Sequence, residues 1–249
     1  MCCFSRPVQR VSNTQIFARA SSEGRQFVVY SMKMSAKEDL AMILPLPTPK
    51  ASDEDAVRFI NLDKYADFFQ DMELGFLPPP SSNLFGRALP KAAAVDAPKL
   101  KVIDVGSFEA SFVPQVKDFA RLDERFRLPA STWNELPAYK DFGFAVFKLK
   151  SGDKKIHPMA FEFPRRDPEI LFFPTVHIHD GKIHQTAMFD HNLYCQKSGG
   201  ENLMRWTESR NPASAFMQVH RTSGIVDKSL HVHRLILKGR RSNRDTLLS

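Results

Sequence analysis

The chain is expected to be organised around the stretch Ile170–Gln196, ILFFPTVHIHDGKIHQTAMFDHNLYCQ, which holds four of the eight histidines. An apolar run alternates into His177-Ile178-His179 and is followed by Asp180-Gly181. Asp-Gly between alternating residues favours a two-residue hairpin turn. The stretch therefore predicts two antiparallel strands that meet at this turn.

Side-chain alternation in this hairpin predicts a face of histidines. With Asp180 and Gly181 as the turn residues, His177 lies opposite His184, and His179 projects from the same face. Three close imidazoles can ligate a divalent transition metal, locally in the manner of the carbonic anhydrase zinc site. The alternative is a polar face in solvent. The opposite, apolar face would pack on a core and holds Val176, Ile178, Ile183, Ala187 and Phe189.

Further candidate ligands extend this metal site. Asp190 shares the histidine face if the second strand continues that far, and His191 follows it. His231 and His233 form a second His-x-His, which would join the site if the two strands are neighbours. We therefore expect a metal-binding protein with zinc as the first choice and iron or copper as alternatives. Zinc would support hydrolysis through a bound water, and iron or copper would support oxygen chemistry.

A second hypothesis concerns the N-terminus. Removal of Met1 would leave Cys2 with a free α-amine beside its thiol, the arrangement of N-terminal-nucleophile hydrolases. Arg19 would then hold a substrate carboxylate or an oxyanion. Cys2 with the later Phe17-Ala18-Arg19 resembles the start of bile-salt hydrolases and penicillin acylases, although no aspartate closely follows Arg19. The third alternative is a non-enzymatic binding module whose histidine face and basic C-terminal residues contact a partner.

Composition and charge limit which functional classes this chain can belong to. The 249 residues are 43% hydrophobic and 25% charged, which is ordinary for a globular protein. The net charge is +7, with a basic cluster at Lys238-Gly239-Arg240-Arg241, but no nucleic-acid-binding motif accompanies it. Three cysteines make no disulfide framework, and neither a signal peptide nor a membrane-spanning segment is apparent. We expect a cytoplasmic protein, and if it is an enzyme its substrate is an unidentified small molecule or peptide.

Hydrophobic periodicity predicts a β-rich α+β protein with mostly antiparallel sheets and a few short helices. The Pro-rich segment 77–99 is a loop, a flap or the boundary between two halves of a single domain spanning 1–249. Helical segments are expected at 63–74, 116–126 and 132–139. Strands are expected at 14–20, 26–34, 39–46, 56–62 and 101–112, then as a pair at 143–149 and 156–163, and as a final pair at 213–221 and 226–238.

Several segments together resemble a bacterial family of unknown function whose members are mostly secreted or envelope proteins. The resemblance implies a single β-rich α+β domain and carries no assigned reaction. This chain departs from the family in lacking a signal peptide and in its histidine-dense C-terminal third. The segments that carry the resemblance are Cys2-Cys3-Phe4, Val11–Ala18, Met42–Pro47, Val105–Ala110, Tyr139–Lys148 and His157–Pro164.

Overall fold

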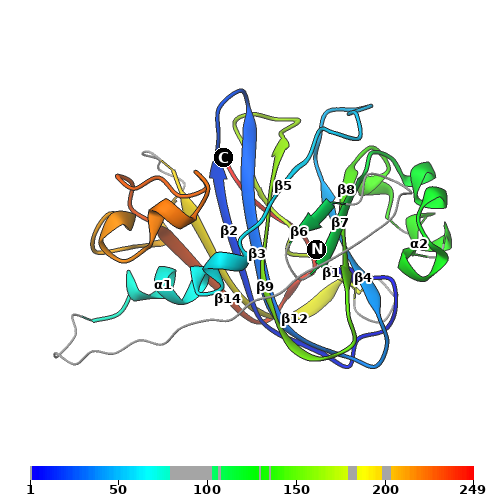
Figure 1. The fold of residues 1–249 in the computed structure, drawn as a ribbon, viewed down its shortest axis with the longest axis horizontal. Helices are drawn as coiled ribbons and strands as arrows, with labels where there is room; N and C mark the ends of the chain where they lie inside the picture. Colours follow the sequence, from blue (N-terminus) through cyan, green and yellow to red (C-terminus); the bar gives the residue numbers. More distant parts are fainter. Residues whose placement is uncertain are drawn as a thin grey trace.

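A computed structural model describes residues 2–78, 103–105, 108–128, 130–134, 136–178, 184–197 and 203–249. Two large β-sheets form the framework of the described part of the chain, with short helices at the two sides (Figure 1). The prediction of a β-rich α+β fold is therefore confirmed.

The larger sheet has seven strands in the order β13-β14-β12-β2-β3-β9-β5. All neighbours in it are antiparallel except β12 and β2, which run parallel. Its strands are β2 (Arg10–Ala20), β3 (Arg25–Ala36), β5 (Arg58–Ile60), β9 (Gly152–Pro164), β12 (Thr186–Gln196), β13 (Thr207–Glu208) and β14 (His233–Ser242).

The second sheet has six strands in the order β11-β1-β4-β8-β7-β6, of which β11 and β1 are parallel. A separate pair joins β10 to β15. The strands of the six-stranded sheet are β1 (Cys2–Phe4), β4 (Leu40–Leu46), β6 (Ile103–Val105), β7 (Phe108–Val113), β8 (Gly143–Leu149) and β11 (His177–Ile178). Those of the pair are β10 (Leu171–Phe173) and β15 (Thr246–Leu248).

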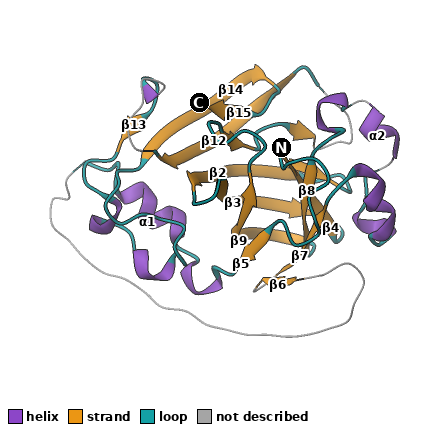
Figure 2. Ribbon diagram, turned by 90° about the horizontal axis from the view of Figure 1, so that it is seen from above, coloured by secondary structure: helices purple, strands orange, loops and turns teal. Residues whose placement is uncertain are grey.

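Among the described residues, two short α-helices and several 3-10 turns cover the outer faces of the sheets (Figure 2). The α-helices are α1 (Phe68–Leu74) and α2 (Ala130–Asn134), and the 3-10 turns are η1 (Asp63–Tyr65), η2 (Val116–Arg121), η3 (Glu124–Phe126), η4 (Pro137–Tyr139), η6 (Ala213–Ala215) and η7 (Val219–Arg221).

Strand β3 shows why the seven-stranded sheet is buried on both faces. Alternate residues of a strand point to opposite sides. Val28 and Tyr30 belong to the apolar cluster between the two sheets, whereas Phe27 and Val29 belong to a second cluster that includes Phe68 of α1. The near-continuous apolar run of β3 is therefore explained by packing on both sides.

Strand β4 plays the same part in the other sheet. Leu40 and Met42 join the cluster between the sheets, and Ala41 and Ile43 join a third cluster that contains Trp133 of α2. The fold is thus layered, from α2 through the six-stranded and seven-stranded sheets to α1 (Figure 1).

Three expected strand pairings are wrong. Strand β11 with His177 pairs with β1, and β12 pairs with β14 and β2, so they do not form a hairpin. Similarly, β8 and β9 lie in different sheets. Residues 213–221 form 3-10 turns rather than a strand that pairs with β14. The expected turn at Asp180-Gly181 lies outside the described residues.

Strands from both sides of residues 79–102 are hydrogen-bonded in each large sheet. Strand β8 pairs with β4, and β9 pairs with β3. The two parts of the chain are therefore interleaved in both sheets.

Candidate functional site

The structure brings two of the predicted metal ligands together. The ring centroids of His177 and His191 are 4.7 Å apart, and Phe189 lies 4.6 Å from His177 and 5.2 Å from His191. His177 belongs to the six-stranded sheet and His191 to the seven-stranded sheet, so the contact joins the two sheets. His191 is 1% exposed. These three rings form a packed aromatic contact inside the protein.

The other two members of the predicted face have different surroundings. The side-chain amide of Asn243 donates to the backbone carbonyls of His177 and His184, at 2.9 Å each, which holds these two residues near each other through the backbone. The His184 side chain is exposed. Asp190 is also exposed, and its Oδ2 accepts a hydrogen bond of 2.8 Å from the Asn13 backbone N–H.

The second His-x-His lies at the start of β14, whose first residue is His233. His231 Nδ1 is 2.8 Å from the Ser209 carbonyl oxygen, and His233 Nε2 is 3.5 Å from Glu208 Oε1. His233 is the register partner of Cys195, four residues along β12 from His191, a separation of about 13 Å at 3.3 Å per residue. His233 is therefore separated along the sheet from His191.

No group of three or more histidine, cysteine, aspartate or glutamate side chains within the described ranges can hold a metal ion. Catalytic zinc sites commonly use three protein ligands, and the described residues supply a pair of imidazoles at His177 and His191. His179 lies outside the described residues. The metal site, its zinc, iron or copper and the associated chemistry thus stay predictions.

The residues of the N-terminal-nucleophile hypothesis lie in different sheets. Cys2 is in β1, where its register partner is His177, and Arg19 is in β2. Arg19 Nε donates to the Ile225 carbonyl at 2.6 Å, and Nη2 donates to the Gly224 carbonyl at 2.5 Å. Arg19 thus anchors a backbone turn. Met1 and the Cys2 side chain lie outside the description, and the nucleophile stays a prediction.

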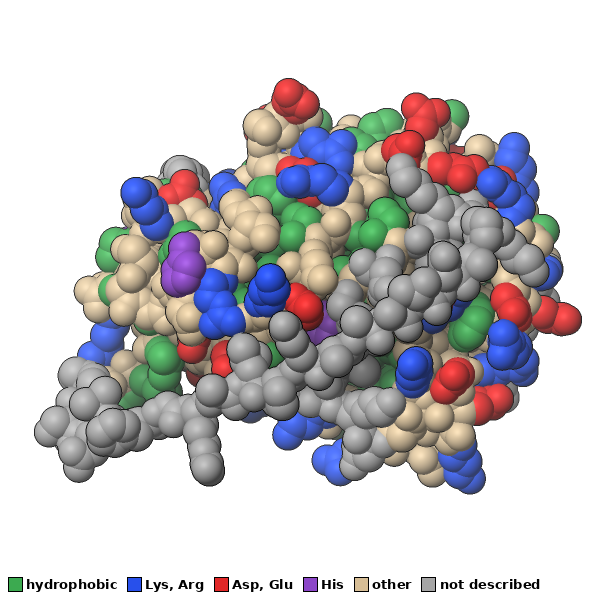
Figure 3. All heavy atoms as spheres, viewed as in Figure 1, with side chains coloured by type: hydrophobic (Ala, Val, Ile, Leu, Met, Phe, Trp, Pro, Cys, Tyr) green, Lys and Arg blue, Asp and Glu red, His purple; other side chains and the backbone are tan. Residues whose placement is uncertain are grey.

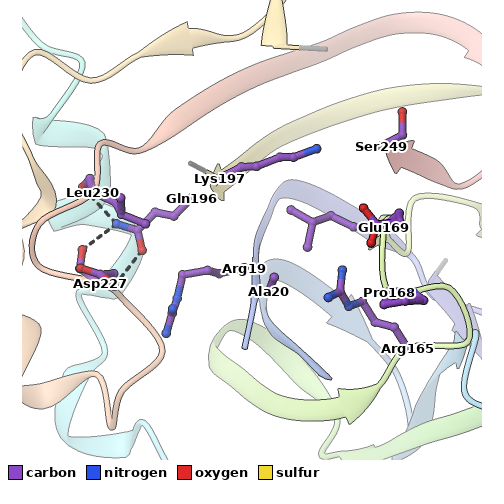
Figure 4. Close-up of a pocket in the computed structure, with 11 residues that line it drawn as sticks. Arg19, Ala20, Arg165, Pro168, Glu169, Gln196, Lys197, Asp227, Leu230 and Ser249 are labelled. Atoms are coloured by element: carbon purple, nitrogen blue, oxygen red, sulfur yellow. Dashed lines mark hydrogen bonds between the residues drawn. The ribbon is translucent and has the colours of Figure 1, made fainter. Parts of the chain in front are cut away.

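A cavity of about 490 Å³ opens beside Arg19, at the ends of β2 and β12 (Figure 4). Gln196 forms part of its wall. Its side-chain amide donates to the carbonyls of Asp227 and Leu230, at 2.7 and 3.1 Å, and accepts from the Asp227 N–H at 2.9 Å. These bonds hold the Gln196 side chain in place. The lining carries both signs of charge: Arg19, Arg165 and Lys197 face the cavity with Glu169 and Asp227.

Hydrogen bonds and burial set the charge states around this cavity. Burial lowers the pKa of Arg19, and the nearby Asp227 opposes this effect. Hydrogen bonds from the Ser229 side chain and backbone N–H lower the pKa of Asp227. The guanidinium of Arg19 also lies over the ring of Phe27, 5.2 Å from its centroid.

The end of α1 is fixed to the larger sheet by a polar network. Glu73 Oε2 accepts from the Tyr194 hydroxyl at 2.5 Å, and Glu73 Oε1 accepts from Arg234 Nη1. The Arg234 guanidinium lies 4.4 Å from the centroid of the Phe76 ring. Burial and the hydrogen bond to Glu73 raise the pKa of Tyr194. A helix on one side of the sheet is thereby held to β12 and β14.

The same helix is held from the C-terminal third of the chain. The Arg210 backbone N–H donates to the Gly75 carbonyl at 3.2 Å, and a Cβ on Gly75 would lie 2.6 Å from the Phe216 ring. The Tyr65 hydroxyl, just before the helix, donates to Asp71 at 2.8 Å. These residues are not predicted from the sequence, because nothing in their spacing links them.

The lowered pKa values of two histidines predict how the stability of the protein depends on pH. Burial lowers the pKa of His233 below its ordinary value of 6.5, with Glu208 opposing and His231 adding to the effect. Burial also lowers the pKa of His157, whose ring stacks on Phe108 at 4.4 Å. As the pH falls through about 6.5, the unfolded chain takes up protons that the folded chain does not, so stability falls.

This prediction is checked by urea unfolding between about pH 7.5 and 5.5, above the range in which carboxylates titrate. The free energy of unfolding should fall over this interval, and the fall should be smaller in the His157→Gln/His233→Gln variant. An equal fall in both proteins would contradict the assignment.

Neither a protein-family model nor a curated protein matches this chain. Solved structures of baculovirus P35 do match it. The crystal structure of P35 aligns with a TM-score of 0.51 and 13% identity over 97% of this chain and 96% of P35. A mutated P35 after caspase cleavage aligns with a TM-score of 0.50 and 14% identity over 96% and 99%. At such identities the likeness shows a shared fold.

Two observations bear on the expected partners. No helix in the described part of the chain is long and apolar enough to cross a membrane. On the face shown in Figure 3, basic and acidic side chains are intermixed. The positive net charge therefore does not form a continuous basic field over the described part of that face.

Proposed function

We propose that this protein is a non-enzymatic binding module whose partner is a protease of the caspase class. The observation that carries the proposal is the likeness to P35 over nearly the whole length of both chains, including a P35 that had been cleaved by a caspase. A non-enzymatic binding module was also the third alternative from the sequence, with the histidine face and the basic C-terminal residues as its contact surface, whereas the proposal here uses another segment. The partner in this case is another protein, which offers a peptide-binding active site.

A feature of this chain supports the proposal. The connection between α1 (Phe68–Leu74) and β6 (Ile103–Val105) includes residues 79–102, which lie outside the described residues. Asp96 is the single acidic residue in this connection, in the sequence Val95-Asp96-Ala97, and lies outside the described residues. Caspases cleave peptide bonds that follow aspartate. The connection thus contains one candidate bond for such a protease.

The anchoring of α1 gives further support. Glu73, Tyr194 and Arg234 tie the end of the helix to the sheet, and the backbone of Gly75 is bound by Arg210. The chain therefore leaves the helix from a fixed position. A fixed end reduces the conformational entropy that a segment loses when a protease binds it, so it favours tight binding.

The experiment mixes the full-length protein with an active recombinant caspase and follows hydrolysis of a fluorogenic peptide substrate. We expect hydrolysis to fall as the protein concentration rises, and mass spectrometry to find cleavage after an aspartate. Asp96→Ala should remove both effects. Asp53→Ala is the matched control, since Asp53 is exposed in another loop, and should retain both. Unchanged caspase activity with the wild-type protein, together with an intact chain, would overturn the proposal.

A further inference from the structure

The basic cluster near the C-terminus lies in an edge region of the larger sheet. Strand β14 (His233–Ser242) pairs along its whole length with β12 on one side. On the other side it pairs with β13, at His233 and Arg234. In the part of the chain that the structure describes, no strand covers this side beyond Arg234, and Figure 2 shows β14 outermost beside β12.

Two hydrogen bonds show which backbone groups of β14 point outward. The Asn243 N–H donates to the Gln185 carbonyl at 2.9 Å, so the odd-numbered residues of the strand face β12. The Ser209 N–H donates to the Val232 carbonyl at 2.7 Å, so the even-numbered residues face away from β12. Both bonds give the same alternation.

The outward groups therefore belong to Ile236, Lys238 and Arg240. The Lys238 carbonyl agrees with this direction, because it accepts a bond of 3.1 Å from Nε of the Arg241 side chain. Such a row of backbone donors and acceptors is a template on which another strand can pair.

The side chains around this edge decide what kind of strand it can accept. Lys238, Arg240 and Arg241 are exposed, and Ile236 is 43% exposed among them. A second copy of the same edge would bring like charges together, which disfavours self-association. The same charges attract a strand with acidic side chains, and Ile236 offers it an apolar contact.

We propose that the outer edge of β14, from Leu235 to Ser242, binds an extended acidic segment of a partner protein as an added β-strand. Backbone hydrogen bonds to Ile236, Lys238 and Arg240 hold the segment, and the basic side chains select acidic sequences. This surface goes beyond the protease partner proposed above and does not rest on it, so either proposal can fail while the other stands.

The test uses synthetic peptides with the full-length protein. The first peptide alternates threonine or valine with glutamate, the second has lysine in place of glutamate, and the third is the glutamate peptide with N-methylated amides at alternate residues. We expect the glutamate peptide to bind at least about tenfold more tightly than either of the others, because one control reverses the charge and the other removes backbone donors.

Amide hydrogen exchange followed by NMR locates the bound peptide. Saturation with the glutamate peptide should slow exchange at Ile236, Lys238 and Arg240 by about tenfold or more, because their N–H groups become hydrogen-bonded. The amides of Leu235 and Leu237, which already face β12, should change little. Unchanged exchange at the outward amides would overturn the proposal.

Variants at one position separate charge from backbone pairing. Arg240→Gln should weaken binding of the glutamate peptide by about twofold to fivefold, because one positive charge is lost. Arg240→Pro should weaken it by a further threefold to tenfold, about the value of one hydrogen bond, because proline also removes the outward N–H. If a single-stranded oligonucleotide binds as tightly as the peptide and leaves β14 exchange unchanged, the edge is a polyanion surface and the proposal fails. The N-methylated peptide provides the same comparison if Arg240→Pro does not fold.

Discussion

Replacing Gln26 by leucine is expected to lower the free energy of unfolding by about 2 to 5 kcal/mol. Gln26 is fully buried on β3, where its Nε2 donates to the Phe172 carbonyl at 2.7 Å and its Oε1 accepts from the Phe172 N–H at 3.0 Å. The Gln26 side chain thus makes the two backbone hydrogen bonds that a neighbouring strand would otherwise make to Phe172 of β10. Leucine fills a similar volume but leaves both buried backbone groups of Phe172 unpaired, each at a cost of about 1 to 3 kcal/mol.

Urea unfolding measures the effect, with Gln9→Leu as the matched control. Gln9 is exposed and its amide oxygen lies 3.4 Å from Ser35 Oγ, so its replacement should change stability by less than about 0.5 kcal/mol. Since β10 has β15 as its one strand partner among the described elements, exchange of the β10 amides should also accelerate in Gln26→Leu. A Gln26→Leu protein as stable as the wild type would refute this account of β10.

Local sequence predicted many strands but not which strands pair. The apolar runs at 14–20, 26–34 and 143–149 lie within β2, β3 and β8, because alternation and β-branched or aromatic content are local properties. Pairing depends on the packing of the whole chain. Strands β8 and β9 follow each other through a short connection and yet belong to different sheets, so adjacency along the chain predicts the wrong partners.

The predicted site shows the same limit. The histidine pattern suggested a face containing His177 and His184, whereas the His177 ring contacts His191, from a strand of the other sheet. The alternation rule could not find this contact, since it assumes a hairpin. Likewise, Glu73 and Arg234 are 161 residues apart and meet through the packing of α1 on the sheet. Neither residue type nor spacing signals that pair.

Replacing Arg234 by methionine is expected to destabilise the protein by about 2 to 4 kcal/mol and to loosen α1. The Arg234 side chain is 17% exposed, while that of Glu73 is 36% exposed, so solvent reduces the effect below that of a fully buried pair. Methionine removes the charge partner of Glu73, next to the Tyr194 hydroxyl, and also the cation that lies over the Phe76 ring. Chemical unfolding and exchange of the α1 amides provide the measurements.

Arg240→Met is the matched control, because Arg240 is exposed on the same strand and the same face as Arg234. It should change stability by less than about 0.5 kcal/mol. A double-mutant cycle with Glu73→Gln should give a coupling energy of about 1 to 3 kcal/mol, and a value near zero would show that the Glu73–Arg234 pair does not hold the helix.

If the fixed end of α1 positions the connection that contains Asp96, Arg234→Met should weaken caspase inhibition at a temperature where the variant is folded, and Arg240→Met should not. Equal inhibition by both variants would separate the anchoring of α1 from binding of the protease.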